Sequence, residues 1–170
     1  MPRRLGALLA GTAALVLVID QVSKAAVRAN FLLGDSVPLI KGFIDLTYVR
    51  NAGAAFGLFP GRLPVFIAIS VGVLGGIAWV WWRLKPQSAW IAVAMGLVAG
   101  GATGNLVDRV VAGRVTDFFD LGWFPVFNIA DMALDIGVAI LFVWILFSSD
   151  ESIIGAVSGD ADDSGPEAVS

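Results

Sequence analysis

The sequence contains no cysteine and no histidine. Without these residues a disulfide framework cannot form, and neither can a zinc site built on thiolate or imidazole ligands. The same absences exclude catalysis by a Cys–His pair or by a Ser–His–Asp triad. A hydrolase of this composition must use the side chains of Asp, Glu, Lys, Ser, Thr or Tyr, and aspartate is the main candidate.

Charge is also scarce. Asp, Glu, Lys and Arg make up 15% of the 170 residues, against about 25% in ordinary soluble domains. Hydrophobic residues make up 58%, so we interpret the chain as an integral membrane protein. The net charge of −3 makes a nucleic-acid partner unexpected, because such proteins carry a basic surface.

Four long apolar runs account for this composition, each near the ~20 residues that a helix needs to cross a bilayer. We expect membrane-spanning helices at about 5–27, 63–82, 88–107 and 127–147. A removable signal peptide has a shorter apolar core and then a small-residue cleavage site, so the first run is interpreted as a retained helix. The expected organisation is a mainly α-helical membrane domain at 1–149 and a disordered acidic tail at 150–170.

The loops between these runs have different compositions. Residues 29–62 contain β-branched and aromatic residues in partial alternation, which predicts a few short strands. Residues 110–126 contain four aromatic side chains, those of Phe118, Phe119, Trp123 and Phe124. Aromatic residues at this density are typical of a short interfacial segment at the membrane–water boundary.

Polar residues gather on one side of the membrane. With four spans, the end of the first helix, the first and third loops, the end of the third helix and the start of the fourth all face the same side. Ionisable residues at bilayer depth are costly and usually functional. The residues that this topology brings together are Asp20, Asn51, Asn105, Asp108, Arg109, Asp117, Asn128 and Asp131.

The side itself is ambiguous from charge alone. Counting Lys and Arg would place the polar cluster in the cytoplasm. We do not follow this count, because several of these cations lie close to acids in the sequence. Arg3 and Arg4, and the tight turn with Arg83 and Lys85, are typical of cytoplasmic anchors.

Two carboxylates in a poorly hydrated site cannot both ionise easily, so one keeps a proton while the other stays charged. Such a pair supplies a base that activates water and an acid that protonates a leaving amine, without histidine or metal. Asp131 suits one role, and spacing leaves Asp117 and Asp120 open for the other. Asn128 is placed to orient a carboxylate or a carbonyl group.

Other interpretations of these residues remain open at this stage. Asp108–Arg109 and Arg114–Asp117 are possible structural ion pairs, and Asp135, one turn deeper than Asp131, is expected to be a buried partner of a neighbouring helix. A proton- or cation-coupled transporter is the alternative function, because intramembrane acids often form relays. A divalent-metal hydrolase is a third hypothesis, because carboxylates suit Mg²⁺ or Mn²⁺.

Five motifs in order resemble those of lipoprotein signal peptidase, also called signal peptidase II. They are DQVSK at 20–24, RNAGAAFG at 50–57, GGATGNLVDR at 100–109, GRVTDFFD at 113–120 and FNIAD at 127–131. The resemblance covers about residues 5–147 and includes the order of the four spans. Thr103 and Asp135 depart from the family's usual residues, and neither belongs to the pair of acids considered above.

The resemblance implies a bacterial inner-membrane aspartyl endopeptidase that uses no metal or cofactor. Its substrates would be prolipoproteins, cleaved before the diacylglyceryl-modified cysteine at the outer face. Carried over by motif, the catalytic pair would be Asp117 and Asp131, and the six other polar residues would support the site or bind substrate. The resemblance further implies a small β-sheet cradle from the first loop, cytoplasmic termini, contact with membrane lipids and inhibition by the cyclic peptide globomycin.

Overall fold

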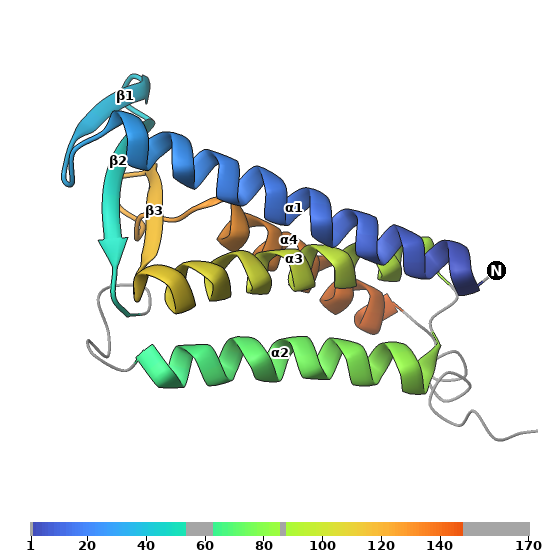
Figure 1. Ribbon diagram of the computed structural model, residues 1–170. Coiled ribbons are helices and arrows are strands. Elements are labelled where there is room, and N and C mark those ends of the chain that lie inside the picture. The colour runs from blue at the N-terminus through green and yellow to red at the C-terminus, as the bar shows by residue number, and fades with distance from the viewer. Residues whose placement is uncertain (1, 54–62, 86–87, 148–170) are drawn as a thin grey trace, which may run out of the picture.

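The computed structural model describes residues 2–53, 63–85 and 88–147, and within these ranges four helices and three strands follow one another (Figure 1). All four helices are long and apolar enough to cross a membrane. The predicted tail at 150–170 and the last residues of the RNAGAAFG motif lie outside the described residues. The elements are α1 (Pro2–Asn30), β1 (Ser36–Ile40), β2 (Ile44–Asn51), α2 (Leu63–Leu84), α3 (Ala89–Ala112), β3 (Val115–Asp120) and α4 (Ile129–Phe147).

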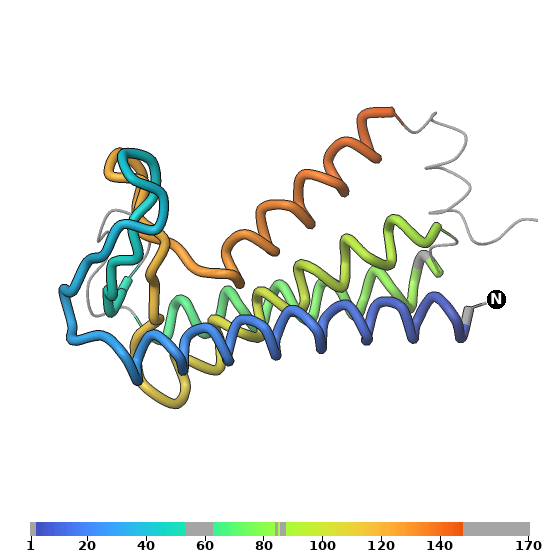
Figure 2. Tube along the Cα trace, turned by 90° about the horizontal axis from the view of Figure 1, so that it is seen from above, coloured from blue at the N-terminus to red at the C-terminus, as the bar shows by residue number. Residues whose placement is uncertain are grey.

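Helix α3 is the centre of the bundle. It contacts α1, α2 and α4, and most of its surface is buried, whereas the other three helices expose most of theirs. Such exposed apolar faces suit contact with lipid. Helix α4 lies close to α3 at its start and separates from α1 and α3 toward its C-terminal end (Figure 2).

Glycines allow α3 to approach its neighbours closely. A Cβ atom added at Gly96 would lie 2.7 Å from the Leu9 carbonyl oxygen of α1, and one added at Gly101 would collide with the Ala130 carbonyl oxygen of α4. Small residues at membrane-helix contacts let backbones pack at short distance. The Gly-rich sequence of α3 therefore determines how closely α1 and α4 approach α3.

Helix α3 continues beyond Val107, where the sequence predicted its end, to Ala112. It ends at Gly113, which has a left-handed backbone (φ 69°) and donates its N–H to the Arg109 carbonyl oxygen. This is a common helix C-terminus, because glycine adopts positive φ without steric cost. The charged residues near the end of the run do not stop the helix, and Asp108 lies within its last two turns.

The sheet lies at one end of the bundle, while the start of α1 and the end of α4 lie at the other (Figure 1). Strands β1 and β2 form an antiparallel hairpin from the first loop, and β3 pairs antiparallel with β2. Strand β3 comes from residues 110–126, where the sequence predicted an interfacial loop. Its β-branched and aromatic residues favour a strand. The same aromatic residues also suit the membrane–water boundary, and for that reason the strand was not predicted.

The β2–β3 register brings the end of the first loop to the third loop. Asn51 pairs with Val115, and Val49 pairs with Asp117. Phe119 and Phe127 then exchange backbone hydrogen bonds of 2.8 and 3.0 Å, which tie the start of α4 to β3. Residues far apart in the sequence therefore meet at one end of the molecule.

Candidate active site

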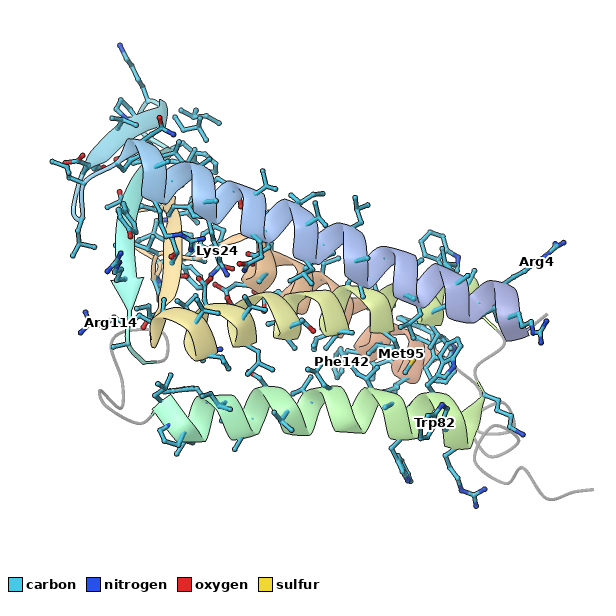
Figure 3. The ribbon with its side chains drawn as sticks, viewed as in Figure 1. Arg4, Lys24, Trp82, Met95, Arg114 and Phe142 are labelled. Atoms are coloured by element: carbon cyan, nitrogen blue, oxygen red, sulfur yellow. The ribbon has the colours of Figure 1, made fainter. Side chains whose placement is uncertain are left out.

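Polar side chains concentrate at the sheet end of the bundle, where the ends of α1 and α3, the strands β2 and β3 and the start of α4 meet (Figure 3). A cavity of about 450 Å³ opens there. One part of its wall is apolar and includes Trp123, Phe124, Phe127 and Met132. The polar residues that line it are Asn51, Asn105, Arg109, Asp117, Asp131 and Asp135.

Asp117 projects from β3 and is buried. Its Oδ2 accepts a hydrogen bond of 3.0 Å from Asn51 Nδ2, and its Oδ1 accepts one of 2.6 Å from Asn128 Nδ2. Burial raises the pKa of Asp117 to about 6, and the negative charge of Asp131 raises it as well, while the two amide hydrogen bonds and the ammonium of Lys24 oppose the rise. Asp117 therefore holds a proton at higher pH than an exposed aspartate.

Asn128 immediately precedes α4 and caps it. The Asp131 N–H donates to Asn128 Oδ1 at 3.0 Å, and the Asn128 N–H donates to Asp131 Oδ2 at 3.2 Å. This reciprocal pair satisfies N–H groups that a helix N-terminus leaves without intrahelical partners. Because Oδ1 of Asn128 is turned toward α4, its Nδ2 faces Asp117. Asn128 therefore links Asp117 and Asp131.

Asn105 on α3 makes the second contact to Asp131. Its Nδ2 donates to Asp131 Oδ1 at 2.7 Å. Its Oδ1 accepts hydrogen bonds from Asn128 Nδ2 at 3.2 Å and from Lys24 Nζ at 2.9 Å. Both oxygens of Asp131 and both oxygens of Asp117 thus have a donor, which fixes the orientation of each carboxylate.

Asp20 and Asp108 join the elements that carry these groups. Asp20 Oδ1 accepts the Ala130 N–H of α4 at 3.0 Å, and its Oδ2 accepts Lys24 Nζ at 2.9 Å. Asp108 Oδ2 accepts the Thr116 N–H of β3 at 2.9 Å. Neither aspartate lines the cavity, so both hold the ends of helices and strands in place.

The side chain of Arg109 has a different environment from that of Asp108, the residue before it. Its guanidinium carbon lies 5.3 Å from the centre of the Phe66 ring, and the side chain lines the cavity. The proposed Asp108–Arg109 ion pair is wrong, because the cations beside Asp108 are Lys24 at 3.6 Å and Arg28 at 3.5 Å. Consecutive residues of a helix do not face each other.

Two other interpretations need correction. Among the described residues Asp117 has amide partners and no ion pair with Arg114, whose side chain lies at the outer edge of the strands (Figure 3). Asp135 is exposed and lines the cavity, so the prediction that it is a buried partner of another helix is wrong. It lies four residues after Asp131 and therefore shares its helix face.

The strand geometry separates Asp117 from Asp120. Successive side chains of a strand point to opposite faces, so residues three apart in β3 lie on different faces. Asp120 Oδ1 accepts the Gly122 N–H at 2.8 Å in the turn after the strand and does not line the cavity. Within the described ranges, no group of three acids could hold a metal ion, so these residues give no support to the metal hypothesis.

Three polar residues of this region, Lys24, Gln21 and Thr116, were not predicted as site residues, and Thr116 Oγ1 accepts a hydrogen bond from Arg28 at 3.0 Å. In the sequence Lys24 is notable only as the last residue of the DQVSK motif, and in the structure it is fully buried beside Asn105. Gln21 Nε2 donates to the Gly104 carbonyl oxygen at 3.1 Å. The signal in the sequence is the run of polar residues DQVSK at the end of an otherwise apolar helix.

A family model described as signal peptidase (SPase) II matches residues 12–147 of this chain. Proteins named lipoprotein signal peptidase are similar to it. The protein from Syntrophomonas wolfei is 47% identical over 80% of this chain and 91% of its own length. The one from Mycobacterium leprae is 41% identical over 95% and 82%.

Solved structures agree with these sequence comparisons. A structure described as a bacterial membrane enzyme has a TM-score of 0.76 and 35% identity to this chain, covering 79% of it and 85% of the other chain. A second structure of the same description has a TM-score of 0.75 and 34% identity, covering 81% and 92%. The likeness therefore extends over nearly all of the helices and the sheet.

Proposed function

The chain belongs to the signal peptidase II family, and from this membership we propose that Asp117 and Asp131 are its catalytic pair. The protein is a multi-pass membrane protease that removes signal peptides from prolipoproteins. The comparisons give no support to the transporter hypothesis. The observation that carries the proposal is that the buried Asp117 of β3 and the half-buried Asp131 of α4 line one cavity and share Asn128 as a hydrogen-bond partner.

The pair has the charge state that peptide hydrolysis needs. The raised pKa of Asp117 favours a form in which the two aspartates share one proton, a property of the pair rather than of either residue. The ionised carboxylate takes a proton from water, whose oxygen attacks the carbonyl carbon of the residue before the modified cysteine. The protonated carboxyl group then donates its proton to the leaving amine, and the C–N bond breaks.

Other cavity residues suit substrate binding. Arg109 and Asn51 line the cavity beside the two aspartates, and their N–H groups are donors for substrate carbonyl oxygens. The apolar wall with Trp123, Phe124 and Met132 offers a surface for the acyl chains of the modified cysteine. Globomycin, a cyclic peptide, would occupy the same cavity, and membrane lipids would surround the exposed helix faces.

The expected location is the bacterial inner membrane, with both termini in the cytoplasm and the cavity at the outer face. The support is the position of the cavity at the end of the bundle opposite to the start of α1 and the end of α4 (Figure 1). Substrates whose signal peptides span the bilayer and whose lipid lies in the outer leaflet would reach such a cavity. No nucleic acid, metal ion or cofactor is required.

The test uses purified full-length protein in lipid nanodiscs. A diacylglyceryl-modified prolipoprotein and its unmodified form are supplied separately, with and without globomycin, and the new N-terminal cysteine is detected by mass spectrometry. We expect cleavage of the modified form only, blocked by globomycin and unaffected by a strong chelator. Cleavage of both forms at equal rates would contradict the proposed substrate, and loss of activity on chelation would restore the metal hypothesis.

A further inference from the structure

A fully buried lysine lies behind the two aspartates. Lys24, in the last turns of α1, points inward between α1 and β3 (Figure 3), and none of its side chain is exposed. Its Nζ lies 2.9 Å from Asp20 Oδ2 and 3.6 Å from Asp108 Oδ2. A buried ammonium needs such partners to offset its lost hydration. A third contact, 2.9 Å to Asn105 Oδ1, gives the ammonium an uncharged acceptor and leads toward the cavity, which Asn105 lines.

This contact is the shorter of two that fix which way the Asn105 amide faces, the other coming from Asn128 Nδ2 to the same oxygen at 3.2 Å. An ammonium group only donates hydrogen bonds, so Asn105 must present its oxygen to Lys24. Its Nδ2 must then point away, and there it donates to Asp131 Oδ1 at 2.7 Å. If the amide were reversed, its oxygen would face the carboxylate of Asp131 and its NH₂ group would face the ammonium, and both contacts would be repulsive.

Among the contacts of the described residues, Asn105 is the side chain that links Lys24 directly to an oxygen of Asp131. Lys24 does not line the cavity, so it does not touch substrate. The other donor to Asp131 is the backbone N–H of Asn128, which does not contact Lys24. Lys24 therefore helps to orient one of the two donors that hold the Asp131 carboxylate.

The charges around this lysine come from four elements. The acids that interact with it are Asp20 on α1, Asp108 on α3, Asp117 on β3 and Asp131 on α4. Two other cations share these acids, since Arg28 on α1 contacts Asp108 and Arg109 on α3 interacts with Asp108, Asp117 and Asp131. The Lys24 ammonium lowers the pKa of Asp117, in opposition to burial and to the charge of Asp131. Removing it would leave the acids with one fewer cation.

We propose that Lys24 is a positioning residue of this peptidase. It orients the Asn105 amide, through it the Asp131 carboxylate, and its charge favours the ionised form of the aspartate pair. The proposal depends on the catalytic roles given above to Asp117 and Asp131. A lysine that served only to hold α1 against α3 would affect folding without affecting the titration of the pair.

The test compares the wild type with Lys24→Met in the nanodisc assay, over a range of pH. Loss of the orienting donor should lower kcat about tenfold or more, with little change in KM. Loss of the charge should raise the pKa of Asp117, so the pH profile of kcat/KM should move upward by about half a unit or more. Arg4→Met, which removes a cation from the exposed far end of the same helix, should change neither.

Two further variants separate positioning from folding. Lys24→Gln keeps a donor for Asp20, and it should show the same upward displacement of the pH profile even if Lys24→Met does not fold. In an Asn105→Ala background, Lys24→Met should lower kcat by a smaller factor than in the wild type. The inference is overturned if a folded Lys24 variant keeps the wild-type pH profile. It is also overturned if Lys24→Met lowers kcat by the same factor in the Asn105→Ala background as in the wild type. Failure of the wild type to cleave would contradict the proposed function itself.

Discussion

At the scale of single residues, amide groups rather than cations surround the two aspartates. Asn51, Asn105 and Asn128 each direct an Nδ2 at a carboxylate oxygen. An amide donor favours the ionised form of its partner without cancelling its charge, so one carboxylate can remain a base beside a protonated one. This explains why three asparagines, unremarkable in the sequence, cluster at the cavity.

The contact from Asn51 predicts a change in pH dependence. Its hydrogen bond lowers the pKa of Asp117, so Asn51→Ala should raise that pKa above its value of about 6. Proton loss from the pair would then occur at higher pH, and the alkaline limb of kcat/KM should move upward. The measurement is kcat/KM on the lipid-modified substrate at each pH.

Asn30→Ala is the matched control for this variant. Asn30 donates to the Ala26 carbonyl oxygen at the exposed end of α1 and does not line the cavity. Its pH profile should coincide with that of the wild type. A downward shift in Asn51→Ala would show that the asparagine does not favour the ionised form of Asp117.

Composition and motif spacing were sufficient to predict the residues that approach the cavity, because topology alone places them on one membrane face. They were not sufficient to predict the environment of each group. Whether Asp135 is buried depends on the direction in which α4 leaves α3, and the partner of Asp108 depends on the rotation of α1. Both are properties of the packed bundle and have no local signal.

At the scale of elements, close packing of α3 against α4 determines where Asp131 lies. Gly101 faces the first turns of α4, and a Cβ atom there would lie 2.9 Å from Leu134 Cγ and collide with the Ala130 carbonyl oxygen. Gly101→Ala should therefore displace α4, lower the stability by about 1–3 kcal/mol and reduce activity. Thermal unfolding in detergent and kcat in nanodiscs are the measurements.

The control for this substitution is Gly75→Ala on α2. A Cβ atom at Gly75 meets nothing within 4 Å, so this variant should keep the wild-type unfolding temperature and activity. Equal effects of the two substitutions would mean that glycine acts through helix flexibility rather than through the approach of α3 to α4.

The strand β3 shows why an element can be missed. Its six residues were interpreted from their aromatic content, whereas their pairing depends on β2, more than 60 residues earlier in the chain. The hairpin of β1 and β2 is local, and the alternation in its sequence was enough to predict strands there. Long-range pairing has no such local signal, yet it is β3 that carries Asp117.

At the scale of the whole molecule, the bundle has a polar end with the sheet and an opposite end with the start of α1 and the end of α4 (Figures 1 and 2). The proposed orientation places the sheet outside the cytoplasm. Because the chain contains no cysteine, a single introduced cysteine reports its side without background. Lys41→Cys, between β1 and β2, and Arg83→Cys, at the end of α2, are both exposed positions.

We expect a membrane-impermeant maleimide to label Lys41→Cys in intact spheroplasts and to label Arg83→Cys only after lysis. Both variants should retain cleavage activity, which confirms that the labelled protein is native. The reverse labelling pattern would place the cavity in the cytoplasm, as the simple count of Lys and Arg residues suggests.

The most direct test of the proposed mechanism compares three isosteric substitutions in the nanodisc assay. Asp117→Asn and Asp131→Asn should each lower kcat on the lipid-modified substrate by a factor on the order of 1,000 or more, while both proteins remain folded in the membrane. Asp120→Asn, on the opposite face of the same strand as Asp117, should retain activity near that of the wild type. Full activity of Asp117→Asn or Asp131→Asn would contradict a mechanism in which these two aspartates share one proton to hydrolyse the peptide bond.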